Sequence, residues 1–183
     1  MATKTNIKAR LKAALSGYRI EAYIVPGPSD SRWLTTGHFA INLGNLIRQG
    51  CDTTVEDFPT FLRALDIKLH ESPSTYNIAK LLPKLPEGIF TSTRVLVESP
   101  LGPSRMLKSS EGYVLWVQDR YLRLFSLDEI SLRCDGYGQV LVDEDLTFMV
   151  MPMNWKLDEL GLAGVKDCPK NLKAKEPERE PEK

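Results

Sequence analysis

Tyr113-Val-Leu-Trp-Val-Gln-Asp-Arg-Tyr-Leu-Arg-Leu-Phe-Ser126 contains two apolar runs, with Asp119-Arg120 between them. Both runs are rich in aromatic and β-branched residues, which are typical of strands. A gap of two residues leaves room only for a tight turn, whereas a parallel crossover needs about a dozen residues or more. The stretch therefore predicts an antiparallel hairpin whose turn is Asp119-Arg120.

The hydrophobic period around this stretch also indicates strands. From Ile89 onward apolar residues recur with a period near 2, and short turns such as Asp135-Gly136 separate the runs. Strands joined by such short connections pair antiparallel. We expect five of them, at Ile89–Glu98, Tyr113–Gln118, Tyr121–Ser126, Gln139–Val142 and Leu146–Met151.

The N-terminal half has helical spacing instead. Helices are expected over Asn6–Ser16 and Thr36–Gln49, over an amphipathic run from Phe58 to Leu69, and over Thr75–Leu82, with one strand at Tyr18–Val25. The predicted fold class is α+β. A helical N-terminal half (helix-rich 1–86) packs on a C-terminal five-stranded antiparallel sheet or small open barrel (β-rich 87–152).

The predicted domain organisation is a single domain, 1–164, that ends with a short helix over 154–162. Residues 165–183 hold charge and proline with almost nothing to bury, so we expect a disordered tail.

Composition narrows the function classes. The 24 Lys and Arg residues balance the 24 Asp and Glu residues, so no overall field favours nucleic acid, a membrane or acidic ligands. The N-terminus shows no apolar signal region, and no apolar run is long enough to span a bilayer. The three cysteines, Cys51, Cys134 and Cys168, are odd in number and widely spaced. This pattern indicates reduced thiols and a cytoplasmic location rather than disulfides or a zinc site.

Motifs for catalysis are missing from the sequence. The two histidines, His38 and His70, accompany no nucleophile motif, and no phosphate-binding glycine loop is present. We therefore expect no cofactor and no metal. One enzymatic alternative stays open, because Asp143-Glu144-Asp145 and neighbouring acidic turns could serve a small metal-dependent hydrolase or nuclease.

Three short segments near the N-terminus resemble the opening of the N-terminal domain of the creatinase and Xaa-Pro peptidase family. They are Arg10-Leu11, Ala22–Pro26 and Arg32–Phe39, in which a helix and a strand precede a turn. The resemblance covers about thirty residues, and the family's metal-binding catalytic domain has no counterpart in this sequence. No functional residue is carried over from it.

A winged helix that binds nucleic acid is a further alternative. The segment from Phe58 to Glu98 could supply a recognition helix and a wing. Base or phosphate contacts would then come from Ser74, Thr75, Asn77, Lys80, Lys84, Arg94, Arg105 and Lys108. Pro83 shortens the recognition helix and the chain is neutral, so nucleic acid is possible but not favoured.

The preferred hypothesis is a non-enzymatic regulatory or adaptor protein that acts through protein–protein binding. Trp, Tyr and Arg are the residue types most enriched where such contacts are strong. The interface candidates of these types are Arg32, Trp33, Arg120, Tyr121, Arg123 and Tyr137. Both faces of the Tyr113–Gln118 strand are apolar, which makes a homodimer possible.

Overall fold

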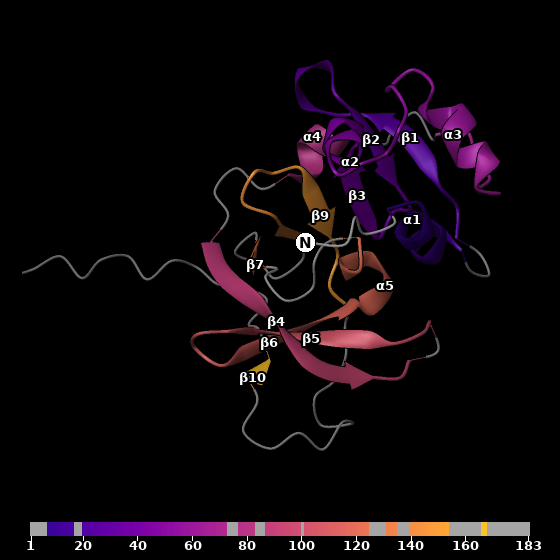
Figure 1. Cartoon of the computed structure of the whole chain (residues 1–183). Coiled ribbons are helices and arrows are strands. Elements are labelled where there is room, and N and C mark those ends of the chain that lie inside the picture. Colours follow the sequence, from indigo (N-terminus) through magenta and orange to yellow (C-terminus); the bar gives the residue numbers. More distant parts are fainter. Residues whose placement is uncertain are drawn as a thin grey trace, which may run out of the picture.

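The protein is built on one large sheet. The computed structural model describes residues 7–16, 20–72, 77–82, 87–99, 101–124, 131–134, 140–153 and 166–167. Ten strands lie in the order β1-β2-β3-β9-β8-β7-β4-β5-β6-β10 (Figure 1). Strands β1 to β9 are antiparallel to their neighbours, and β10 pairs parallel with β6.

The predicted fold class is wrong. The N-terminal half is not helical, since it contributes three strands to the sheet, and the sheet has twice the expected number of strands. The described helices are short and lie beside the sheet. Their bounds are α1 Ile7–Leu15, α2 Leu43–Arg48, α3 Phe58–Ala64, α4 Ile78–Leu81 and α5 Asp119–Leu122, with a 3-10 turn η1 at Pro28–Asp30.

The first three strands form an antiparallel meander. Their bounds are β1 Tyr23–Pro26, β2 Arg32–Thr35 and β3 Phe39–Asn42. The helix predicted over Thr36–Gln49 is therefore wrong in its first part, which is a turn followed by strand β3. Gly37 has a φ of 83°, which reverses the chain between β2 and β3. Asn42 then caps α2 by accepting a hydrogen bond from the backbone N–H of Asn45 at 3.3 Å.

The remaining strands form the other part of the sheet. Their bounds are β4 Glu87–Val97, β5 Ser104–Ser109, β6 Tyr113–Gln118, β7 Ser131–Cys134, β8 Leu141–Val142, β9 Phe148–Val150 and β10 Lys166–Asp167. The hairpin predicted after Gln118 is also wrong. Asp119–Leu122 forms the helical turn α5, so the strand expected at Tyr121–Ser126 does not begin at Tyr121. The helical turn places Arg123 one turn after Asp119, where the two side chains pair.

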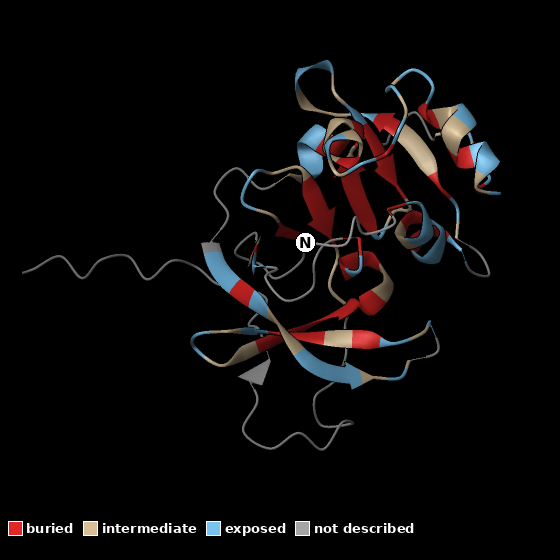
Figure 2. Ribbon diagram, viewed as in Figure 1, coloured by how far each residue is buried: buried red, intermediate tan, exposed pale blue. Residues whose placement is uncertain are grey.

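Pairing of β3 with β9 joins the two parts of the chain. Phe39 lies opposite Val150, and its ring stacks on Tyr121 with ring centroids 4.7 Å apart. The Phe148 ring is tilted against the Phe39 ring, with the ring centroids 6.3 Å apart. One hydrophobic core therefore runs from α1 and β3 to α5 and β9, and Figure 2 shows β3, α5 and β9 as largely buried, in contrast to β4.

Two predicted features lie outside the described residues, namely the short helix over 154–162 and most of the tail 165–183. Within the tail, Lys166 and Asp167 form β10, opposite Tyr113 and Val114. In the part of the chain that the structure describes, no helix is both long and apolar enough to cross a membrane.

Candidate functional site

A buried carboxylate lies at the start of α5. Asp119 is 1% exposed, and its Oδ1 atom accepts a hydrogen bond from Nε of Arg105 at 2.6 Å. Its Oδ2 atom accepts one from Nε of Arg123 at 2.5 Å. Because a buried carboxylate is costly unless it is paired and hydrogen-bonded, the two arginines supply the partners that its burial requires.

Arg120, which follows Asp119 in the sequence, connects two distant segments of the chain. Nη1 of Arg120 donates to the carbonyl of Ser16 at 3.1 Å, just after α1, and Nη2 donates to the carbonyl of Leu101. Gly102 makes this approach possible. Its φ is 104°, and a Cβ atom there would lie 2.9 Å from Nη2 of Arg120. The guanidinium thus ties the end of α1 to the turn between β4 and β5.

These side chains border a cleft of about 300 Å³. Its lining residues are Ala13, Ser16, Pro103, Asp119, Arg120 and Arg123. Among them the hydroxyl of Ser16 has no histidine or unpaired carboxylate beside it to act as a base, which nucleophilic catalysis requires.

A second feature is an exposed apolar strip on the β4–β5 hairpin. Ile89 is 53% exposed, Val95 38%, Leu96 45% and Leu101 56%. Figure 2 shows most of β4 as exposed. β7 pairs with β4 only between Glu87 and Thr91. Over the described residues, the edge of Ser92–Val97 that faces away from β5 consequently has no strand beside it.

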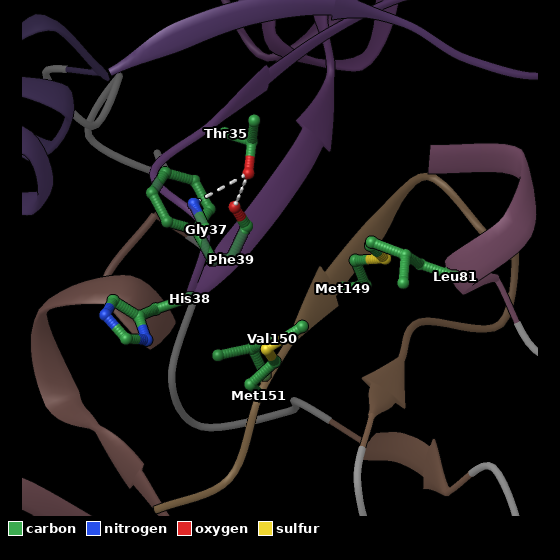
Figure 3. Close-up of a pocket in the computed structure, with 8 residues that line it drawn as sticks. All are labelled: Thr35, Gly37, His38, Phe39, Leu81, Met149, Val150 and Met151. Carbon is green, nitrogen blue, oxygen red and sulfur yellow. Dashed lines mark hydrogen bonds between the residues drawn. The ribbon is translucent and has the colours of Figure 1, made fainter. Parts of the chain in front are cut away.

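A depression near His38 is too small for a substrate. Figure 3 shows its lining, with Leu81 of α4 beside Met149 of β9 and with His38 at the other side. Thr35 fixes the turn by donating to the carbonyl of Phe39 at 2.6 Å and accepting from the N–H of Gly37 at 3.0 Å. The volume of the depression is about 10 Å³, which is room for about one water molecule.

Two of the three aromatic interface candidates, Trp33 and Tyr121, lie in the core. Trp33 and Tyr121 are each 2% exposed, so neither ring is available to a partner in the folded protein. The indole N–H of Trp33 donates to Oγ of Ser31 at 2.9 Å. Burial raises the pKa of the Tyr121 phenol, an effect that the nearby Thr36 side chain and the charge of Arg120 reduce.

The charged interface candidates have different positions. Arg32 is exposed on β2, and the side chain of Arg123 is 55% exposed. The backbone carbonyls described above hold Arg120. Tyr137 lies outside the described residues. Arg120 and Arg123 are thus brought together at the cleft, whereas Arg32 lies on a strand in the other part of the sheet.

The nucleic-acid candidates are not brought together on a recognition helix. Ser74, Thr75 and Lys84 lie outside the described residues. Asn77 caps α4 by accepting from the N–H of Ala79 at 3.0 Å, and α4 is a single turn. Lys80, Arg94 and Lys108 are exposed on three different elements, α4, β4 and β5.

Two further observations concern that alternative. Arg105 has its guanidinium engaged by Asp119 and by the carbonyl of Thr93 at 2.8 Å, so it is not available for a phosphate contact. Between α3 and α4, Leu69 forms a parallel bridge with Ala22. The segment therefore does not have the short turn of a helix-turn-helix.

The acidic turn has a structural role. Oδ1 of Asp143 accepts from the backbone N–H groups of Thr147 and Phe148, both at 2.7 Å, and Oδ2 accepts from Oγ1 of Thr147 at 2.6 Å. Its oxygens are thereby occupied in closing the turn before β9. No group of three or more His, Cys, Asp or Glu side chains within the described ranges could hold a metal ion.

The exposed strip was missed by reasoning that looked for aromatic residues. The signal was Val95-Leu96-Val97, because three consecutive apolar residues on a strand must place at least one on each face. Val97 packs against the cluster of Met106, Val114 and Trp116, which leaves Leu96 on the open side.

Comparisons of the chain with known protein families, with curated proteins and with solved structures find no match. The local resemblance of Arg10–Phe39 to the creatinase and Xaa-Pro peptidase domain gains no support from them. Any functional conclusion has to come from the residues themselves.

Proposed function

We propose that this protein is a non-enzymatic regulatory or adaptor protein that binds another protein along the free edge of β4. The observation that supports this function is the exposure of Val95 and Leu96 beside a stretch of strand that lacks a described neighbour. An unpaired strand edge offers a row of N–H and C=O groups to an incoming strand. Such strand addition is a recurring mode of peptide recognition.

The apolar side chains provide the favourable free energy. Burying a leucine or valine side chain fully stabilises a complex by about 1.5–3 kcal/mol. Leu101 lies in the turn after β4 and is 56% exposed, so a partner that covers Leu96 can also reach it. The bulge between Ser92 and Leu96 bends the strand, which separates this binding end from the end that pairs with β7.

The order of residues favours a second copy of the chain as the first partner to test. Exposed Arg94 and exposed Glu98 flank Val95-Leu96-Val97. Antiparallel pairing of two copies about Leu96 would place Arg94 of each copy opposite Glu98 of the other. Opposite charges that face each other across strands are favourable, and a two-fold contact is the commonest in homo-oligomers.

The test compares two exposed leucines. Leu96→Lys introduces a charge into the proposed interface, whereas Leu81→Lys introduces the same charge on α4, where the leucine is 37% exposed. Light scattering across a concentration series measures self-association, and a photo-crosslinking amino acid at position 96 or 81 identifies other partners. We expect binding to be lost only in Leu96→Lys. Equal binding by both variants would exclude the β4 edge.

A further inference from the structure

We propose that the cleft between α1, the β4–β5 turn and α5 binds a small ligand through a phosphate or carboxylate group. This binding activity goes beyond the protein contact at β4 and uses different side chains. It depends on the arrangement of Arg120 and Arg123 around a cavity of about 300 Å³.

The charges around the cleft are unbalanced. Among the described lining residues, Arg120 and Arg123 carry two positive charges and Asp119 carries the one negative charge. Both oxygens of Asp119 already accept hydrogen bonds from Arg105 and Arg123. The lining therefore keeps a net positive charge, and a concave site lined by one sign of charge attracts an ion of the opposite sign more strongly than a flat surface does.

The donors that could face an anion are held in place. Asp119 engages Arg123 through Nε alone, so the two terminal nitrogens of this guanidinium can still donate. Each terminal nitrogen of Arg120 uses one N–H for a carbonyl and retains a second. Guanidinium groups bind carboxylate and phosphate with paired hydrogen bonds, and fixed donors lose less entropy on binding.

The rest of the lining suits a small organic body attached to the anion. Ala13 of α1 and Pro103 before β5 supply apolar contact, and Ser16 supplies a hydroxyl. Pockets for small ligands have volumes from about 300 Å³ upward and combine apolar walls with a few polar groups that fix the ligand's orientation. The cleft lies at the lower limit of that range, so the ligand is expected to be a small metabolite-sized anion.

Inorganic phosphate and acetate are the two probes. Each is titrated into the full chain at constant ionic strength, and binding is followed by amide chemical shifts around α5 and the end of α1. We expect saturable binding of at least one anion. Arg123→Gln and Arg120→Gln each remove charge-assisted hydrogen bonds to the anion, so each should weaken binding about tenfold or more. The preferred anion identifies whether the natural ligand carries phosphate or carboxylate.

A matched variant controls for general charge effects. Arg48→Gln removes one exposed arginine from α2, outside the cleft, and should leave anion affinity unchanged. Circular dichroism verifies that each variant is folded, and Arg120→Gln keeps the Asp119 pairs intact if Arg123→Gln does not fold. Equal weakening in all three variants would overturn the proposal, as would the absence of saturable binding for both anions.

Discussion

The Nε atom of Arg105 on β5 lies 2.6 Å from Oδ1 of Asp119, the first residue of α5. The backbone N–H of Asp119 also donates to the carbonyl of Pro103 at 2.9 Å. Both contacts connect the segment just before and within β5 to the end of β6. They fix the direction in which the chain leaves β6 as a helical turn, where the sequence predicted a hairpin.

Replacing Asp119 should be strongly destabilising. Asp119→Ala leaves Arg105, whose side chain is 12% exposed, without its counter-charge. Breaking a buried ion pair by removing one partner costs about 3–5 kcal/mol of unfolding free energy. Urea denaturation measures the loss. Arg123→Gln is the comparison variant, because its side chain is 55% exposed and Asp119 keeps its pair with Arg105, so the loss should be clearly smaller than for Asp119→Ala. A loss below about 1 kcal/mol for Asp119→Ala would show that the cluster is not structural.

Gly27→Ala should destabilise the loop before β2. A Cβ atom at this position would lie 2.2 Å from the Trp33 ring, which is 2% exposed and cannot move outward without losing its packing. Overpacking of this kind costs about 1–3 kcal/mol.

A double-mutant cycle identifies the cause of that loss. In a Trp33→Leu background the same Gly27→Ala change should cost clearly less, because the shorter side chain leaves room for the methyl group. Equal costs in both backgrounds, measured by urea denaturation, would mean that the indole is not the obstacle.

The helix α1 could be predicted from local spacing, because Ile7, Leu11, Ala14 and Leu15 form one stripe and all are buried. The segment Thr36–Gln49 has similar spacing but folds differently. Phe39 and Ile41 are placed by pairing with β9, which lies more than a hundred residues later in the chain. No local pattern contains that information, and tertiary pairing overrides helix propensity.

The candidate site shows the same limit. Arg120 and Arg123 were predicted as interface residues because arginine is enriched at protein contacts and both lie in the Tyr113–Ser126 stretch. That stretch was predicted to be a hairpin, so the prediction placed both side chains on its surface. Their partners Ser16, Leu101 and Asp119 come from three separate segments. Because side chains meet there only after the chain folds, the cleft could not be predicted, whereas the apolar run Val95–Val97 was readable in advance.

Raising the pH should weaken the fold through Cys51. This thiol is 3% exposed, and burial raises its pKa from 9.0 to about 11, although nearby Lys8 lowers it somewhat. Well below pH 9 the thiol is protonated in both states and its contribution is constant. Between the two pKa values the unfolded chain releases the proton and the folded chain retains it, so stability falls as pH rises.

The effect of Cys51 on stability is measured as the difference in unfolding free energy between the wild-type protein and Cys51→Ala. Between about pH 8 and pH 10 the wild-type protein should lose about 1 kcal/mol more unfolding free energy than Cys51→Ala. The other titrating groups are common to both proteins, so they largely cancel in the comparison. Parallel pH profiles for the two proteins would contradict the burial argument.

Tyr121 should act as part of the core and not as a binding residue. Its ring stacks on Phe39 at 4.7 Å with 29° between the ring planes, and it is 2% exposed. Tyr121→Ala removes this contact and leaves a cavity, and large-to-small changes of an aromatic core residue cost about 3–5 kcal/mol. Tyr121→Phe keeps the stack and loses only the phenol hydroxyl, and the loss of one such polar group should cost at most about 0.5–1.5 kcal/mol. Thermal and urea unfolding should therefore separate the two variants by at least about 1.5 kcal/mol. If Tyr121→Ala instead folds with near wild-type stability, the stack of Tyr121 on Phe39 does not stabilise the core. Tyr121 would then again be a candidate interface residue.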